Sequence, residues 1–182
     1  MDPDDRNRGV LIDLDLAVRV QGSDKKPIGE PQPPGTITFR SVDLCKDNPQ
    51  EVFYRHDLES FFFVLAWIFT HYDKGKPVLR DQYRHWHEGD LKSIAGSKMG
   101  FLIMASLRLT SPPRLQTSWI VRLAEMFDTA YRSRSGFQTR QRRTSIPESF
   151  DEETLEGQIT YEKFMDILEA PDLPYLEAPD SE

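Results

Sequence analysis

The sequence contains a single cysteine, Cys45, among its 182 residues. One thiol excludes an internal disulfide framework and a cysteine-rich zinc site, and it fits a reducing compartment. The acidic, polar N-terminus contains no recognisable secretory signal. The longest uncharged apolar run, Ser60–Thr70, is too short to span a bilayer. We therefore expect an intracellular protein, cytoplasmic or nuclear, that does not enter a membrane.

Positive charge is also scarce, because 23 Lys and Arg residues are outnumbered by 30 Asp and Glu residues, for a formal net charge of -7. An acidic chain is poorly suited to bind polyanions, so we expect neither nucleic acid nor an acidic membrane surface as its main partner. A protein substrate or protein partner fits better. The hydrophobic fraction of 38% is sufficient for a core.

Composition divides the chain into a polar N-terminus at 1–8, one folded domain at 9–168 and an acidic, Pro-rich tail at 169–182. We expect the first of these segments to be disordered. Residues 133–158 join a basic block to an acidic block, and such a polar insert is expected to form a loop because it cannot bury enough apolar surface. The apolar, β-branched residues of 9–20 predict a short β-hairpin near the N-terminus.

Helical patterns fill most of the remaining domain, and the strongest lies within 50–72, where no charge occurs from Phe61 to Phe69. A helix that is apolar on all faces is expected to be surrounded by other helices. We therefore expect Phe61, Leu65 and Ile68 among its inward residues. Further helices are predicted at 79–89, 90–109, 115–131 and 160–168.

Two carboxylates, Asp13 and Asp15, follow an apolar run in the string LIDLDLA at 11–17. Their spacing points both to one side of a strand end, where they would suit Mg²⁺ together with waters and a phosphate. Solvated acids at the end of a strand are the simpler explanation. The string also resembles the signature of haloacid-dehalogenase-like phosphatases, in which Asp13 would be the nucleophile and Asp15 the acid/base.

The D-F-G motif of protein kinases likewise follows an apolar strand, and in that alignment Asp13 takes the place of its Asp while Asp15 stands at the Gly position. The phosphatase fold requires alternating strands and helices, whereas only helices and loops are recognisable after residue 50. The kinase order requires a Gly-Thr segment that ends near an acid, followed by a buried helix headed by Asp. The sequence supplies GTITFRSVDL at 35–44 and YRHDLESFFFVLAWI at 54–68.

The order and spacing of these three motifs resemble the divergent fungal-type protein kinase family. The resemblance extends from about residue 9 to about residue 168, and residues 133–158 match poorly. It implies a mainly helical fold, the C-lobe of a protein kinase with a short N-terminal β-hairpin and no N-lobe. In intact relatives it implies Ser/Thr kinase activity with Mg²⁺ and ATP.

The resemblance also assigns roles to individual residues. Asp13 would hold Mg²⁺ between the β- and γ-phosphates of ATP. Thr36 would contact the catalytic loop and help to seat the protein substrate. Asp57 would accept hydrogen bonds from backbone N–H groups of the catalytic loop. Because that loop is not encoded in this sequence, we expect Asp57 to be partly exposed or short of partners.

Asp43 stands where the family has the Glu that ends the A-P-E motif, a structural residue that normally pairs with an arginine late in the lobe. Both Arg132 and Arg134 are candidates for that partner, and the sequence does not distinguish them. For the lobe as a whole, a solvent-exposed side on the apolar helix at 57–71 would defeat the kinase-lobe assignment.

The sequence lacks the remaining catalytic parts of a kinase. It contains no G-x-G-x-x-G loop, no V-A-I-K lysine and no H-R-D catalytic loop. We therefore assign no catalytic residue and expect the chain alone to be inactive, as a truncated kinase or a pseudokinase that binds neither Mg²⁺ nor ATP appreciably. A magnesium-dependent phosphatase using Asp13 and Asp15 and a helical protein-interaction module remain as alternatives.

A further modification site is suggested by Arg142 and Arg143, which precede Thr144 and Ser145. Basic residues directly before a hydroxyl side chain are typical of substrates of basophilic kinases. A solvated basic loop is the alternative interpretation.

Overall fold

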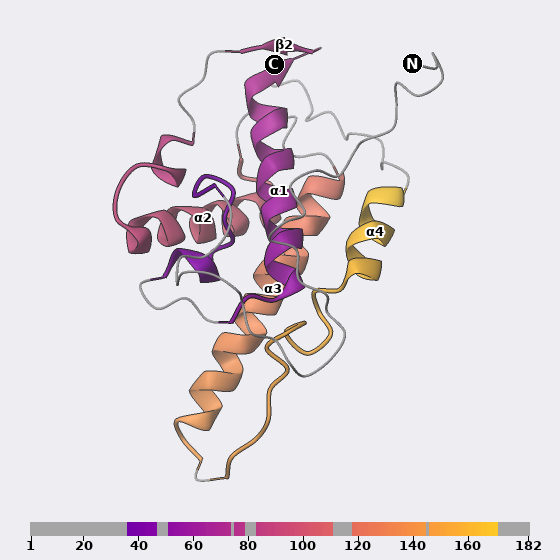
Figure 1. Cartoon of the computed structure of the whole chain (residues 1–182). Coiled ribbons are helices and arrows are strands. Elements are labelled where there is room, and N and C mark those ends of the chain that lie inside the picture. Colours follow the sequence, from indigo (N-terminus) through magenta and orange to yellow (C-terminus); the bar gives the residue numbers. More distant parts are fainter. Residues whose placement is uncertain are drawn as a thin grey trace, which may run out of the picture. The chain divides into compact units, whose positions relative to one another are not determined.

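The computed structural model describes residues 36–46, 51–73, 75–78, 83–110, 118–144 and 146–170. These residues form four α-helices, short 3-10 helices and a two-stranded antiparallel sheet (Figure 1). The fold is therefore mainly helical, as predicted. Within the part of the chain that is described there is no parallel sheet, and no helix there is long and apolar enough to cross a membrane. The hairpin predicted at 9–20 lies outside the described residues.

Helix α1 (Tyr54–His71) forms where the strongest helical pattern was predicted. One side of it packs into the core, and its completely buried apolar residues are Phe62, Phe63 and Ala66. The opposite side is open, since Phe61 is 57% exposed and Ile68 44% exposed. The prediction of inward-facing residues is therefore wrong for Phe61 and Ile68, whereas Leu65 is partly buried and packs against the core. At 3.6 residues per turn these residues share one side, and an uncharged sequence does not specify which side meets the core.

A tight hairpin follows α1 directly, with strand β1 (Tyr72–Asp73) antiparallel to β2 (Lys76–Pro77). Gly75 in the turn has φ +74°, a conformation in which glycine carries no steric penalty. Of the helix predicted at 79–89, the described residues form only a 3-10 turn at Arg84–Trp86.

Helices α2 (Leu91–Ser106) and α4 (Tyr161–Glu169) begin at polar caps and confirm two predictions. The Asp90 side chain accepts a hydrogen bond of 2.9 Å from the backbone N–H three residues on. The Thr160 hydroxyl accepts the equivalent bond at 3.2 Å. Such caps satisfy N–H groups that the helix itself leaves without partners.

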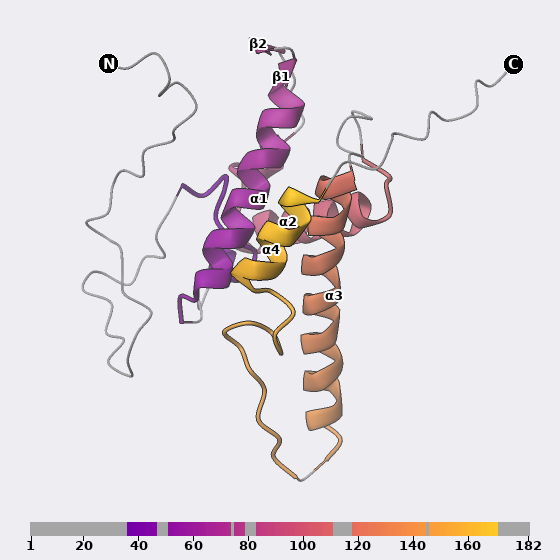
Figure 2. The same ribbon diagram turned by 90° about the vertical axis from the view of Figure 1, so that its right-hand side faces the viewer.

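Helix α3 (Ser118–Gln141) continues well into the segment 133–158, which was predicted to be a loop. Its C-terminal half extends beyond the other helices (Figures 1 and 2). The part of the segment after α3 also packs, because Leu155 is completely buried, as is Ile159 directly after the segment. The prediction of an unpacked insert is wrong because a few buried residues, Arg134 among them, anchor a segment whose average composition is polar.

The core lies where α1, α2 and α3 meet, and α4 packs against α1 and α3 (Figure 2). Aromatic rings join these helices. The ring centroids of Phe62 in α1 and Phe127 in α3 are 5.6 Å apart, and those of Phe63 and Trp86 are 5.0 Å apart. Edge and tilted contacts of this kind add to the stabilisation from burial.

Candidate functional site

The residues that carry the Gly-Thr motif form a compact segment, 36–46, in front of α1. It starts with a turn in which the Thr36 carbonyl accepts hydrogen bonds from the N–H groups of Phe39 and Arg40, at 2.9 and 3.0 Å. It ends with a 3-10 helix at Asp43–Cys45. Thr36 itself is exposed, whereas residues 41–45 are buried. The segment thus holds Thr36 at the surface, while its second part, residues 41–45, forms a buried base in the structural sense.

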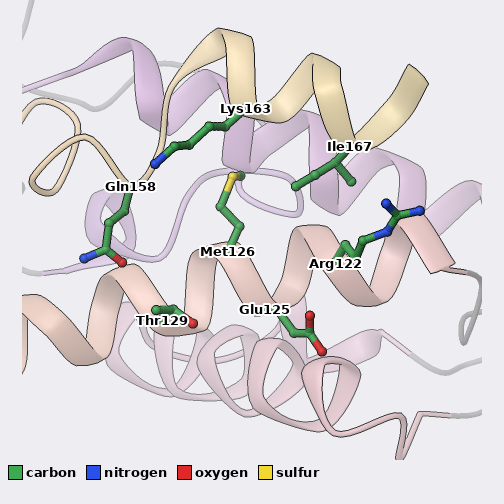
Figure 3. Close-up of a pocket in the computed structure, with 7 residues that line it drawn as sticks. All are labelled: Arg122, Glu125, Met126, Thr129, Gln158, Lys163 and Ile167. Carbon is green, nitrogen blue, oxygen red and sulfur yellow. The ribbon is translucent and has the colours of Figure 1, made fainter. Parts of the chain in front are cut away.

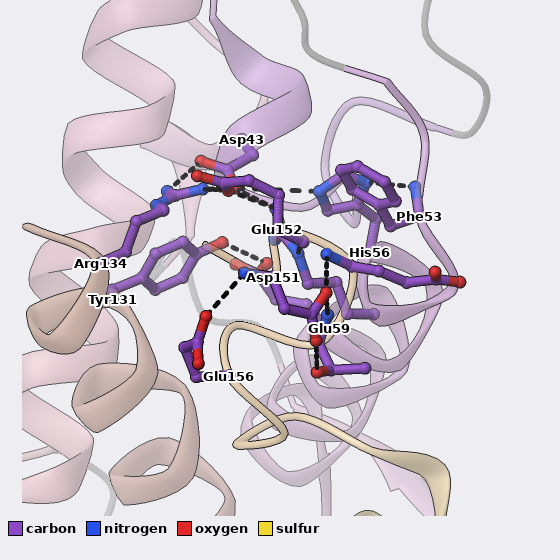
Figure 4. A network of polar contacts seen from close by, with 12 residues as sticks. Asp43, Phe53, His56, Glu59, Tyr131, Arg134, Asp151, Glu152 and Glu156 are labelled. Atoms are coloured by element: carbon purple, nitrogen blue, oxygen red, sulfur yellow. Dashed lines mark hydrogen bonds and ion pairs between the residues drawn. The ribbon is translucent and has the colours of Figure 1, made fainter. Parts of the chain in front are cut away.

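Asp43 anchors that base inside a cluster of cations (Figure 4). Arg134 of α3 donates two hydrogen bonds to its carboxylate, at 2.6 and 2.7 Å. Arg55 of α1 approaches to 2.9 Å and Lys46 to 2.6 Å. Burial by itself would raise the pKa of Asp43, but the neighbouring His56, Arg134 and Lys46 side chains hold that pKa far below its usual range. The Asp43 carboxyl group is therefore ionised near neutral pH.

This geometry identifies the partner of Asp43 that the sequence left open. Arg134 is the partner, through a bidentate contact that matches guanidinium and carboxylate geometry. Arg132 instead donates to Asp128 at 2.9 Å, one turn away on the exposed side of α3. The Asp43–Arg134 pair ties the segment 36–46 to a helix more than eighty residues along the chain.

His56 supports the same anchor from the first turn of α1. Its Nδ1 accepts a hydrogen bond of 3.1 Å from the N–H of Phe53, and its Nε2 lies 3.8 Å from an oxygen of Asp43. Burial lowers the pKa of His56 and outweighs the opposite effect of Asp43. The imidazole is therefore neutral near pH 7, with its proton on the nitrogen that faces Asp43.

Glu59 is a second, separate acid in the interior, 1% exposed. The hydroxyl of Tyr131 donates to it at 2.6 Å and the N–H of Val42 at 3.1 Å (Figure 4). Burial raises the pKa of Glu59 to about 7, although the bond from Tyr131 opposes the shift. Glu59 thus joins α1, α3 and the segment 36–46 through a carboxyl group that titrates close to neutral pH.

Lys98 of α2 is the third buried charge that reaches the segment 36–46. Its ammonium group donates to the carbonyl oxygens of Ile37 and Arg40, at 2.8 and 2.5 Å. Burial lowers the pKa of Lys98 to about 8. Together, Arg134, Glu59 and Lys98 fix the segment from three helices.

Asp57 lies on the open side of α1. It is exposed, as expected from the absence of a catalytic loop, and the described residues provide no hydrogen bond or ion pair to it. Neighbouring protein atoms displace part of its water and raise the pKa of Asp57. Its helical position places it on the same side as Phe61 and Ile68, both of which are exposed.

A shallow groove of about 360 Å³ runs between α3 and α4 (Figure 3). Its floor is apolar and its rim is polar, and the lining residues are Arg122, Glu125, Met126, Thr129, Gln158, Lys163 and Ile167. None of the predicted site residues lines it. We therefore do not assign the groove to nucleotide binding.

The remaining predicted site residues are less well placed for a structural test. Asp13, Asp15 and Ser145 lie outside the described residues. Thr144 is exposed just beyond the end of α3. Among the residues that the structure does describe, no group of His, Cys, Asp and Glu side chains is arranged to hold a metal ion.

Neither Glu59 nor Lys98 was predicted as a site residue, and a usable signal was present only for Lys98. Lys98 is the only charged residue between Ile94 and Ser106. Glu59 follows Asp57 at the start of the apolar helix. A lone charge within an apolar helical stretch indicates a buried, partnered group, because an unpaired buried charge is too costly to persist.

Comparison with known proteins gives one match. A family model described as fungal protein kinase matches residues 1–69, a range that includes all three motifs found in the sequence. No curated protein and no solved structure was found to match the chain. Over its first 69 residues this chain is therefore similar to the fungal protein kinase family.

Proposed function

We propose that this chain supplies the helical, substrate-binding part of a fungal-type Ser/Thr protein kinase domain and that the chain alone does not transfer phosphate. The family match supports a kinase-related function. The geometry adds a firmly anchored segment 36–46, which leaves Thr36 at the surface where it can take part in seating a protein substrate.

The observation that carries the proposal is the open side of α1. Phe61 is 57% and Ile68 44% exposed on a helix whose other side forms the centre of the core, and Tyr72 directly after the helix is 47% exposed. Exposed apolar surface costs about 25 cal/mol per Å² relative to burial, and contiguous patches usually mark a contact site. The exposed Asp57 lies on this same side.

The open side of α1 meets the criterion given under Sequence analysis, by which a solvent-exposed side of this helix counts against a kinase lobe. By that criterion, residues 1–182 alone do not form a complete kinase lobe. The open side is the one that carries Asp57, to which the resemblance assigns contacts with the catalytic loop. In the proposed domain this loop covers Phe61 and Ile68 and donates its N–H groups to Asp57.

The proposed inactivity of the chain alone follows from what phosphoryl transfer requires. Its catalysis depends on positioning and electrostatic stabilisation by the Gly-rich loop, the strand lysine and the catalytic base. None of these motifs is present in the sequence. Asp13 can bind Mg²⁺ only weakly, because one or two carboxylates need help from bound phosphates.

The same open side of α1 would also suit a helical protein-interaction module, which is the second candidate. A magnesium-dependent phosphatase gains no support, since the described residues form no parallel sheet.

Sequencing of transcripts upstream of the Met1 codon tests the proposal and separates the two candidates. We expect an open reading frame that encodes an H-R-D catalytic loop and a Gly-rich loop. The longer protein should phosphorylate a generic substrate, whereas residues 1–182 should not. In-frame stop codons directly upstream in every transcript would overturn the assignment to a longer kinase and favour the interaction module.

A further inference from the structure

We propose that Lys98 is a positioning residue that sets the conformation of the turn at 36–40 and with it the place of Thr36. This inference deepens the proposed function. It rests on that function only for the role of the turn in seating a protein substrate. The contacts themselves stand independently of any kinase activity.

The ammonium group of Lys98 is enclosed by the turn that it binds. Its side chain is completely buried, and it donates to the carbonyls of Ile37 and Arg40 at 2.8 and 2.5 Å. The Cys45 sulfur lies 3.9 Å away on a further side, and the Phe63 ring centroid lies at 5.0 Å. The N–H donors of an ammonium group are thus matched by acceptors that all belong to the segment 36–46.

No carboxylate lies within ion-pair distance of this cation in the described part of the chain. Burial alone would make a lysine here costly, and it lowers the pKa of Lys98 to about 8. Lys98 is still mostly protonated at pH 7. The carbonyls of Ile37 and Arg40 therefore offset the desolvation cost of the ammonium group, as a carboxylate usually does for a buried cation. The buried charge is tolerated only while the turn is folded around it.

Arg134, Glu59 and Lys98 bind different parts of the segment 36–46, so loss of the Lys98 ammonium group should have a local effect. Arg134 and Glu59 bind Asp43 and Val42, in the second half of the segment. In the first half, which contains Thr36, Lys98 binds two carbonyl oxygens, and the Phe39 ring contacts the Trp67 ring with centroids 5.8 Å apart. Loss of the ammonium should therefore release residues 36–40 while the helical core stays folded.

Cys45 provides a built-in probe, because it is the only cysteine of the chain, it is completely buried and it lies beside Lys98. The experiment compares the wild type with Lys98→Met, which keeps the volume but removes the donors. Lys92→Met serves as the matched control on an exposed lysine of the same helix. The readouts at pH 7 are the rate of Cys45 labelling by a thiol reagent and the hydrogen exchange of individual backbone amides.

In Lys98→Met we expect Cys45 labelling to accelerate by roughly ten- to a hundred-fold, the range that corresponds to losing a hydrogen bond to a charged group. Exchange of the Phe39 and Arg40 amides should accelerate with it, while amides around Phe127 in α3 should not change. Lys92→Met should match the wild type. If Lys98→Met does not fold, Lys98→Gln, which keeps an N–H donor without the charge, allows the same comparison.

Two results would overturn the inference. One is unchanged labelling and exchange in a folded Lys98 variant. The other is an acceleration that also appears at Phe127 and follows the global unfolding constant in urea, since that would show a purely structural role. Neither result depends on phosphate transfer, so failure here would leave the proposed kinase function standing.

Discussion

Replacing Glu59 by Gln should stabilise the protein relative to the wild type, and this advantage should grow as the pH rises. The reason is that the native carboxyl group holds its proton unusually tightly. Burial raises the pKa of Glu59 from 4.5 to about 7. A group whose pKa is higher in the folded state contributes stability below its unfolded pKa and loses that contribution as the pH rises through the folded value. The window is therefore pH 4.5 to 7.

The size of the effect follows from the shift. The difference between 4.5 and about 7 corresponds to about 3 kcal/mol at about 1.4 kcal/mol per pKa unit. Glu59→Gln mimics the protonated acid, since its amide can meet both Tyr131 and the N–H of Val42. Relative to the wild type, the variant should gain about 3 kcal/mol in free energy of unfolding between pH 4.5 and pH 7.5.

Other groups near Glu59 titrate or carry charge and also change the free energy of unfolding with pH. The wild type and the variant must therefore be compared at each pH, because the pH dependence of one protein alone does not isolate Glu59. Asp43 raises the pKa of Glu59 further, Arg55 lowers it, and the positive charge of Lys98 also lies nearby. The lowered pKa of His56 makes its own contribution run in the opposite direction with pH. These groups are present in both proteins and largely cancel in the difference.

Urea denaturation of both proteins at pH 4.5 and 7.5, followed by tryptophan fluorescence, measures this difference. Glu125→Gln on the exposed face of α3 is the control and should show no pH-dependent difference from the wild type. A Glu59→Gln difference that does not change with pH, or that changes in the opposite direction, would refute the reasoning.

Three further predictions concern packing, pairing and modification. Phe62→Ala should cost about 3–5 kcal/mol in unfolding free energy, because this ring is completely buried; a cost below about 1 kcal/mol in urea denaturation would contradict the observed core. Arg134→Met should cost about 3 kcal/mol, near the lower end for a broken buried pair, since other cations remain near its carboxylate partner, while Arg132→Met should cost under about 1 kcal/mol, and equal costs in denaturation would count against the anchor. A basophilic kinase should phosphorylate Thr144 or Ser145 without unfolding the protein, adding about two negative charges beside the exposed arginines; peptide mass spectrometry that finds neither residue modified would exclude the site.

Much of the helical fold could be predicted from the sequence, because its signals are local. The caps at Asp90 and Thr160 and the apolar run of α1 each specify a helix without reference to the rest of the chain. The importance of Asp43 was also recognised, through the resemblance. Its partner could not be predicted, because the choice between Arg132 and Arg134 depends on which side of α3 faces the segment 36–46.

The remaining errors involve long-range packing. The exposure of Phe61 depends on what covers α1, and this information is not present in the helix itself. The continuation of α3 depends on the buried pairing of Arg134 with a residue far away in the sequence. The lone charge of Lys98 is visible in the sequence, but its acceptors are backbone carbonyls, which no side-chain motif reveals.

The most direct test of the central claim is a phosphoryl-transfer assay on purified residues 1–182. The chain is incubated with radiolabelled ATP, Mg²⁺ and a generic protein substrate, beside an Asp13→Ala variant as control. Because the motifs for the phosphate loop, the strand lysine and the catalytic base are not in this sequence, the account predicts no transfer above the control. Transfer clearly above the Asp13→Ala level would contradict it, by showing that the residues present are sufficient for phosphate chemistry.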